Sequence, residues 1–206
     1  MNYPLQSKVP DLASAYILAG GASRRMGRDK ALLPISGRPL LVLLAELLAS
    51  SFESVTLLAP ADRYEQFGYR SIPDLRPDSG PLAAIESALE DTKSPWNLIV
   101  ACDMPNLTRD WILTLLEARE RLEHGELCIV SGVSEDSPSP LCALWHKDAL
   151  PYVKTALDLG NLRVRDLLGP LKAKILIPPD PKILANWNYP EDCIAGESEG
   201  NTNLGG

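Results

Sequence analysis

The sequence predicts an α/β fold: a single three-layer, Rossmann-like domain with a mainly parallel central sheet. Short apolar runs of strand length alternate with leucine-rich segments at helical spacing, the pattern of consecutive βαβ units. The 206 residues are 45% hydrophobic, enough for one sizeable core, and they contain no internal repeat or linker. Chemically distinctive loops follow three of the apolar runs, at the sheet edge where such folds bind ligands.

The first half of the chain shows this alternation clearly. The near-continuous apolar run at 14–19 suits a buried parallel strand, and we expect a turn at 35–39. Pro39 fits the first turn of a helix, where its missing N–H is not needed. That helix has an apolar stripe of leucines: Leu40, Leu41, Leu43, Leu44, Leu47 and Leu48. The elements expected next are strands at 54–59 and 69–72, a short helix at 62–67, and a helix that opens at Pro81.

The second half continues in the same way. A very apolar strand is expected at 96–101, and Thr108 can cap the following helix, which ends near Leu122. The polar, proline-containing segment at 134–140 is expected to be a loop. The remaining expected elements are strands at 127–131, 141–145 and 174–177, and helices at 148–159 and 163–168.

The two ends of the chain differ in composition from the rest. Residues 1–13 are polar and contain two prolines, and we expect a flexible arm there. Residues 196–206 consist mostly of Glu, Ser, Asn, Thr and Gly, which predicts a disordered tail. The predicted domain therefore spans residues 14–195.

Composition excludes several classes of protein. The net charge of −7 and the pI of about 4.9 argue against a nucleic-acid-binding surface. The chain has no apolar run of about eighteen residues and no apolar signal-peptide core, so we expect no membrane span and a cytoplasmic location. Four irregularly spaced cysteines and two histidines do not form a zinc motif or a disulfide framework.

One segment concentrates positive charge directly after the first predicted strand. Gly20 and Gly21 can let the backbone approach an anion closely, and successive N–H groups in such a turn form an anion-binding nest. The basic residues that follow are Arg24, Arg25, Arg28 and Lys30. The Walker and dinucleotide-binding glycine motifs are both absent. The charge pattern by itself is compatible with either a polyphosphate site or a solvated basic loop.

Two aspartates follow other predicted strands. Asp103 comes after the apolar strand at 96–101, where a buried carboxylate needs a partner, and Mg²⁺ is a suitable one because it takes oxygen ligands. The alternative is that Asp103 caps the next helix. Asp74 lies in a proline-rich loop, where it is either part of a ligand site or an ordinary turn residue.

The pattern from Leu18 to Pro34, L-A-G-G-x-S-x-R-M-G-x-D-K-x-L-L-P, resembles the opening motif of the molybdenum cofactor guanylyltransferases, the MobA family of nucleotidyltransferases. The segment 102–105 is similar to the C-D-x-P segment of that family, and residues 80–85 are similar to its G-P-L-A-G-I. The resemblance spans roughly residues 14 to 193. It implies that the α/β domain is a nucleotidyltransferase domain.

The resemblance also implies a role for each marked residue. Arg25 and Lys30 would neutralise the triphosphate and Asp103 would hold Mg²⁺, so these three are the implied catalytic residues. The implied nucleotide-binding residues are Leu18, Ala19, Gly20, Gly21, Lys30, Asp74 and Asp103. Asn186 and Asn188, in a segment similar to the family's N-x-N-T-P-E-D, would bind the acceptor.

The implied reaction transfers GMP from Mg-GTP to the terminal phosphate of molybdenum-molybdopterin. It forms the guanine dinucleotide cofactor and pyrophosphate. An ionised phosphate acceptor needs no general base, so catalysis would consist of positioning and charge neutralisation. The implied partners are GTP and molybdenum-molybdopterin, with transient contact to molybdenum-insertion proteins or molybdoenzyme chaperones. No nucleic acid or membrane partner is expected.

Three alternatives remain open. A molybdopterin cytidylyltransferase usually reads A-A-G where this chain has Ala19-Gly20-Gly21, so this tripeptide favours guanine. The spacing of the basic motif and the short chain argue against a sugar-phosphate nucleotidyltransferase. A catalytically silent nucleotide-binding module is the third alternative, and the presence of Arg25, Lys30 and Asp103 together argues against it.

Four positions depart from the family pattern. Ala84 stands where the family usually has glycine, and Tyr189 where it has threonine. The segment 57–60 lacks the asparagine that often contacts the nucleotide, and Ser139 stands where Gln or His usually precedes Pro-Leu. The last two departures bear on nucleotide and acceptor binding.

Overall fold

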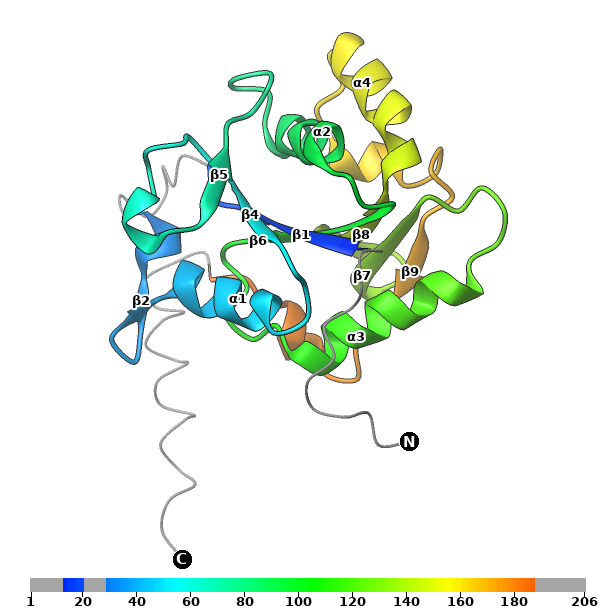
Figure 1. Ribbon diagram of the computed structural model, residues 1–206. Coiled ribbons are helices and arrows are strands. Elements are labelled where there is room, and N and C mark those ends of the chain that lie inside the picture. The colour runs from blue at the N-terminus through cyan, green and yellow to red at the C-terminus, as the bar shows by residue number, and fades with distance from the viewer. Residues whose placement is uncertain (1–12, 21–28, 188–206) are drawn as a thin grey trace, which may run out of the picture.

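The computed structural model describes residues 13–20 and 29–187. These residues form a seven-stranded sheet with helices on both faces, which confirms the predicted three-layer α/β fold (Figure 1). The strand order is β5-β4-β1-β6-β8-β7-β9. The strands are β1 (Ala13–Leu18), β4 (Val55–Leu58), β5 (Arg70–Ile72), β6 (Trp96–Ala101), β7 (Cys128–Ser134), β8 (Ser137–His146) and β9 (Lys174–Leu176). Pairing is parallel except where β8 pairs with β6 and β7.

Helices α2 (Pro81–Asp91) and α4 (Leu150–Asp158) cover one face of the sheet, and α1 (Leu40–Ala49) and α3 (Arg109–Ala118) cover the other (Figure 1). Alternate residues of β1 face opposite layers, as the period of a strand requires. Ile17 packs in the core with α1 and α3, whereas Tyr16 packs in the core with α2 and α4. The hydrophobic residues predicted to form helix stripes and buried strands therefore build two cores, one on each side of the sheet.

Short 3₁₀ turns occupy several places where helices were predicted. The predicted helices at 62–67 and 163–168 are the 3₁₀ turns Glu65–Phe67 and Val164–Leu167. The helix from Thr108 ends as α3 at Ala118 and continues as a 3₁₀ turn, and the Thr108 hydroxyl caps it by accepting from the Trp111 N–H at 3.3 Å. The predicted helix at 148–159 likewise begins with a 3₁₀ turn before α4.

The turn predicted at 35–39 is a small hairpin of β2 (Pro34–Ile35) and β3 (Arg38–Pro39). Its two loop residues, Ser36 and Gly37, both have positive φ, at 49° and 80°, which matches the two-residue loops that suit strand twist. The hairpin lies between the segment with the basic motif and α1, so it positions the start of that helix.

The prediction of a polar loop at 134–140 is wrong in extent. Residues 137–140 belong to β8, and only 135–136 lie outside the strands of the β7–β8 hairpin. Two register shifts interrupt this pairing, between Val130 and Ser131 and between Gly132 and Ser134. Such bulges tolerate prolines within a strand, which explains how a proline-rich segment could join the sheet.

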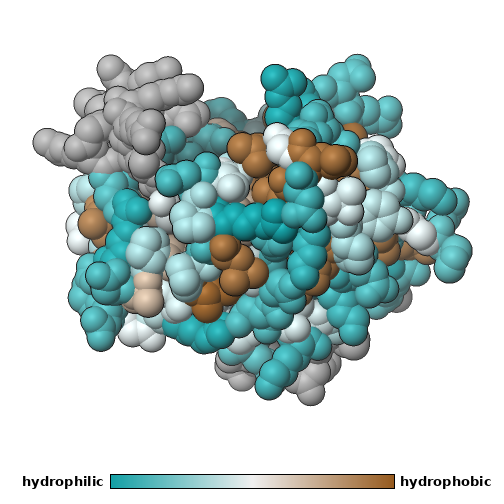
Figure 2. Space-filling view, turned by 90° about the horizontal axis from the view of Figure 1, so that it is seen from above, coloured by the Kyte–Doolittle hydropathy of each residue, from teal (hydrophilic) through white to brown (hydrophobic). Residues whose placement is uncertain are grey.

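The predicted arm and tail lie outside the described residues, except that Ala13 is the first residue of β1. In the part of the chain that the structure describes, no helix has the length and apolar character needed to cross a membrane. Seen from above α2 and α4, the surface is mostly hydrophilic, and its apolar patches are separated by polar residues (Figure 2).

The carboxyl ends of four strands form one aligned row. The last residue of β1, Leu18, pairs with Leu58 on one side and Ala101 on the other, and Leu58 pairs with Ile72. Gly20, Asp74 and Asp103 each lie two positions after a residue of this row. Because parallel strands end at the same edge, the sheet brings all three distinctive loops together.

Candidate active site

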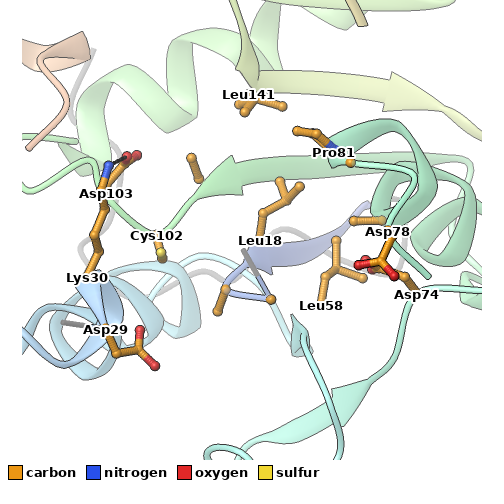
Figure 3. Close-up of a pocket in the computed structure, with 15 residues that line it drawn as sticks. Leu18, Asp29, Lys30, Leu58, Asp74, Asp78, Pro81, Cys102, Asp103 and Leu141 are labelled. Atoms are coloured by element: carbon orange, nitrogen blue, oxygen red, sulfur yellow. Dashed lines mark hydrogen bonds and ion pairs between the residues drawn. The ribbon is translucent and has the colours of Figure 1, made fainter. Parts of the chain in front are cut away.

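A pocket of about 400 Å³ opens at this row of strand ends (Figure 3). Its size falls in the range of small-molecule sites. Its lining comes from the strand ends, the loops after them and the start of α2. The lining residues are Leu18, Ala19, Gly20, Asp29, Lys30, Leu58, Asp74, Asp78, Gly80, Pro81, Ala84, Ala101, Cys102, Asp103 and Leu141.

One end of the pocket carries an ion pair. Lys30 Nζ donates to Asp103 Oδ2 at 3.1 Å, and the two side chains are 19% and 16% exposed. Lys30 begins a 3₁₀ turn that Asp29 caps, and Asp103 follows β6, so two separate segments bring the charges together. Figure 3 shows this pair at one side of the pocket, away from Asp74 and Asp78.

The second oxygen of Asp103 fits a cation. Asp103 Oδ1 is buried and has no hydrogen-bond partner among the residues that the structure describes. A buried carboxylate oxygen without a donor is costly, and Mg²⁺ binds such oxygens together with waters and phosphate oxygens. No group of three or more His, Cys, Asp or Glu side chains suited to a metal occurs within the described ranges. Of the described residues, Asp103 is therefore the one whose unpartnered oxygen could bind a metal at this end of the pocket.

The opposite end of the pocket carries Asp74 and Asp78 (Figure 3). Asp74 Oδ1 is buried and makes no hydrogen bond with any described residue. Burial raises the pKa of Asp74. The loop that carries Asp74 is anchored to α2, because the Leu75 N–H donates to Ser87 Oγ at 2.8 Å and Arg76 pairs with the buried Glu86. The loop therefore holds the Asp74 carboxylate in place, and its Oδ1 remains available to accept a hydrogen bond from a ligand.

Apolar side chains line the space between the two charged ends. Leu18 and Leu58 lie between the Lys30–Asp103 pair and Asp74, and Leu141 and Pro81 lie across from them (Figure 3). Gly20 is close to the neighbouring strand: a Cβ added there would lie 3.1 Å from the Leu58 carbonyl oxygen. Among the described residues, the pocket thus offers an apolar slot with the Lys30–Asp103 ion pair at one end and the carboxylates of Asp74 and Asp78 at the other.

Residues 15–175 match the family model described as the MobA-like NTP transferase domain. The chain belongs to this family. It is therefore a nucleotidyltransferase, with the pocket at the place where this class of sheet binds ligands.

Individual relatives agree with this assignment. A protein of Deinococcus radiodurans named probable molybdenum cofactor guanylyltransferase is 38% identical over 93% of this chain and 97% of its own length. A Nostoc protein of the same name is 31% identical over 90% of this chain and 91% of its own length. The solved structure of molybdopterin-guanine dinucleotide biosynthesis protein A from Archaeoglobus fulgidus has the same fold, with a TM-score of 0.77 at 21% identity. That structure covers 91% of this chain and 98% of its own.

The structure brings most of the predicted MobA-like site residues together. The pocket is lined by the predicted residues Leu18, Ala19, Gly20, Lys30, Asp74 and Asp103. The predicted residues Gly21, Arg25 and Asn188 lie outside the described residues, as do Arg24 and Arg28. The alternative role of Asp103 as a helix cap is not observed, because Thr108 caps α3.

Asn186 is exposed and does not line the pocket. Its neighbour Trp187 is buried, and the Trp187 N–H donates to the Asp103 carbonyl oxygen at 2.9 Å. This bond places the backbone beside Asn186 next to the backbone of Asp103. The predicted acceptor role of Asn186 stays a prediction.

Several lining residues were not predicted. Leu58 and Leu141 belong to segments where the sequence departs from the family pattern, but neither was assigned to the site, and Asp29 lies within the basic motif without an assigned role. Cys102 also lines the pocket, but burial and the nearby Asp103 and Asp29 raise the pKa of its thiol to about 12. Cys102 is therefore protonated at neutral pH and serves as a packing residue.

Proposed function

We propose that this chain transfers GMP from Mg-GTP to the terminal phosphate of molybdenum-molybdopterin. An oxygen of the acceptor phosphate forms a bond to the α-phosphorus of GTP, and the bond from that phosphorus to the oxygen bridging the β-phosphate breaks. The products are the guanine dinucleotide form of the cofactor and pyrophosphate. The names of the relatives support both the nucleotide and the acceptor.

The observation that carries the proposal is the order of chemical groups along the pocket. The Lys30–Asp103 pair, the apolar walls and Asp74 follow one another from one side to the other (Figure 3). A purine nucleoside triphosphate presents anionic phosphates, an apolar ring face and polar base edges in the same order. The match supports a bound nucleotide with its phosphates at Lys30 and its base toward Asp74.

At the phosphate end, the residues act by neutralising charge. Lys30 would donate to phosphate oxygens and stabilise the negative charge that moves onto the leaving pyrophosphate. Arg25, from the same motif, is proposed to share this role. Asp103 would hold Mg²⁺, which when bound supplies further neutralisation of the phosphate oxygens. The backbone at Leu18, Ala19, Gly20 and Gly21 is proposed to contact the nucleotide.

At the base end, Asp74 would select guanine. The Watson–Crick edge of guanine carries two adjacent donors, N1–H and the N2 amino group, which an ionised carboxylate can accept together. Cytosine presents one amino donor beside an acceptor nitrogen, which would face the carboxylate unfavourably. The unpartnered buried oxygen of Asp74 therefore supports GTP as the donor substrate.

The acceptor would approach from the Asp103 side, where the Trp187 N–H joins the C-terminal segment to the Asp103 backbone. Asn186 and Asn188 are proposed to bind it there. Action in the cytoplasm and transient contact with molybdenum-insertion proteins or molybdoenzyme chaperones stay predictions from the family resemblance.

The proposal is tested by measuring pyrophosphate release with GTP or CTP, in the presence of Mg²⁺ and molybdenum-loaded molybdopterin. Release with GTP alone supports the proposed reaction and base choice. Release with CTP instead would keep the phosphate chemistry and assign the chain to the cytidylyl reaction. Nucleotide binding without release from either would contradict the proposed acceptor.

A further inference from the structure

Asp29 is held by two consecutive side chains from the segment after β4. Arg63 donates to Asp29 Oδ2 through Nε at 3.1 Å and through Nη2 at 2.9 Å. The Tyr64 hydroxyl lies 2.9 Å from the same oxygen and 3.1 Å from Oδ1. Tyr64 is fully buried, so its hydroxyl depends on these partners for hydrogen bonding.

The same two side chains also contact the end of β1. The Tyr64 hydroxyl lies 3.0 Å from the Ala19 carbonyl oxygen, and Arg63 Nη1 donates to the Gly20 carbonyl oxygen at 3.3 Å. The single hydroxyl hydrogen of Tyr64 is thus placed between Ala19 and Asp29. Arg63 and Tyr64 therefore fix the distance between Gly20 and Asp29, which are nine positions apart in the sequence.

Asp29 in turn fixes the backbone of Lys30. Asp29 Oδ1 accepts from the Ala31 N–H at 3.1 Å and so caps the 3₁₀ turn that begins at Lys30. From this turn the Lys30 side chain extends to Asp103. Because the cap depends on the orientation of the Asp29 carboxylate, the position of Lys30 depends on Arg63 and Tyr64.

We propose that Arg63 and Tyr64 are positioning residues for triphosphate binding, acting through Asp29 and the end of β1. This inference rests on the proposed function, since it assigns their effect to a nucleotide held by Lys30 and the strand-end backbone. Neither residue lines the pocket, so they act without touching the substrate. Burial and Asp29 raise the pKa of Tyr64, which keeps its hydroxyl protonated and able to donate at neutral pH.

The chain contains a matched control with the same chemistry. Arg70 donates to both carboxylate oxygens of Asp91, and the hydroxyl of the buried Tyr16 donates to Asp91 Oδ2 at 3.1 Å. None of these three residues lines the pocket. Asp91 is the last residue of α2, and Pro81 at the other end of this helix lines the pocket. The length of the helix, about 15 Å, therefore separates Asp91 from the pocket.

The experiment measures the dissociation constants of GTP and GMP by isothermal titration calorimetry with Mg²⁺ present, using the full chain. The variants are Arg63→Met, Arg63→Lys and Tyr64→Phe, and the controls are Arg70→Met and Tyr16→Phe. We expect Arg63→Met and Tyr64→Phe to weaken GTP binding about tenfold, as the loss of supporting contacts around a ligand site typically does. GMP binding should change much less, because it lacks the β- and γ-phosphates, and Arg63→Lys should lie between Arg63→Met and the wild type.

The control variants should keep the wild-type ratio of GTP to GMP affinity, even where they lower the melting temperature as much as Arg63→Met and Tyr64→Phe do. An unchanged ratio in Arg63→Met and Tyr64→Phe, or an equal fall in the controls, would overturn the positioning role alone. A wild-type protein that binds neither nucleotide would overturn the proposed function and this inference with it. If Arg63→Met does not fold, Tyr64→Phe and Arg63→Lys give the same comparison with smaller changes.

Discussion

The Lys30 ammonium donates to Asp103 Oδ2 at 3.1 Å, although 73 positions separate the two residues in the sequence. Asp103 is also the residue proposed to hold Mg²⁺, so the lysine and the metal compete for the same carboxylate. A nucleoside triphosphate would offer Lys30 a second anionic partner at this end of the pocket. The pair therefore predicts that nucleotide and metal strengthen each other's binding.

Lys30→Met should strengthen Mn²⁺ binding measured without nucleotide by about tenfold, because a positive charge next to the carboxylate is removed. The same variant should weaken GTP binding. Mn²⁺ binding is followed by electron paramagnetic resonance of the free ion. Lys154→Met, which removes a cation from the exposed pair with Glu90, is the control and should leave both affinities unchanged. Unchanged or weaker Mn²⁺ binding in Lys30→Met would contradict the competition.

Asp103→Ala should lower turnover about 10³-fold or more, because it removes the proposed metal ligand from the site of charge development. The fold should persist, since Asp103 is not among the buried core residues of the described ranges and its side chain pairs there with Lys30. Steady-state pyrophosphate release measures the first effect, and circular dichroism with thermal melting measures the second. Near-normal turnover in a folded variant would refute the metal assignment.

GTP binding should depend on the ionisation of Asp74. Burial raises the pKa of this carboxyl, so the affinity for GTP should weaken as the pH falls through that raised value. Asp74→Asn should bind GTP about tenfold more weakly or worse, since an amide cannot accept from both guanine donors as well. Its affinity should also lose this pH dependence. Calorimetric titrations across the acidic range test both statements. They would be contradicted if the GTP affinities of the wild type and Asp74→Asn changed with pH in parallel.

The same carboxyl predicts a pH dependence of stability. Its raised pKa means that the folded state holds the proton more tightly than the unfolded chain does. The resulting stabilisation is fully present below the ordinary aspartate pKa of about 4 and is lost as the pH rises through the raised value. The melting temperature of the wild type should therefore rise relative to Asp74→Asn as the pH is lowered through this window. A constant difference between the two proteins would show that Asp74 is not buried as described.

Gly20→Ala tests the close contact between Gly20, which follows β1, and the end of β4. The added Cβ would lie 3.1 Å from the Leu58 carbonyl oxygen, so the backbone at the pocket must shift. We expect a stability loss of about 1 kcal/mol and a higher KM for GTP. Gly169→Ala is the control, because nothing lies within 4 Å of its added Cβ. Equal kinetic effects of the two substitutions would refute a specific role for Gly20.

Most of the fold could be predicted because its strands and helices have strong local patterns. The apolar run at β6 and the leucine stripe of α1 carry their period in the sequence itself. The β7–β8 hairpin could not be predicted to its full length, because residues 137–140 are polar and proline-containing and join the sheet through a bulged pairing with β7. The 3₁₀ turns were predicted as helices because a few residues do not distinguish the two periods.

The site was predictable where its residues belong to contiguous motifs, as Lys30, Asp74 and Asp103 do. Leu141 was not, because its place at the pocket follows from the antiparallel pairing of β8 with β6. The contacts of Asp29 with Arg63 and Tyr64 were also out of reach, since they join segments 34 and 35 positions apart. Only the folded chain shows such pairings, and they decide how the motif residues are held.

In the proposed reaction, GMP passes from GTP to a pterin phosphate with release of pyrophosphate. The most direct measurement follows the α-phosphorus label of GTP into the pterin product, alongside pyrophosphate release, with Asp103→Ala as the inactive control. We expect one labelled pterin dinucleotide for each pyrophosphate released by the wild type, and no label transfer by the control. Pyrophosphate released without labelled pterin, or label transfer that Asp103→Ala leaves intact, would contradict it.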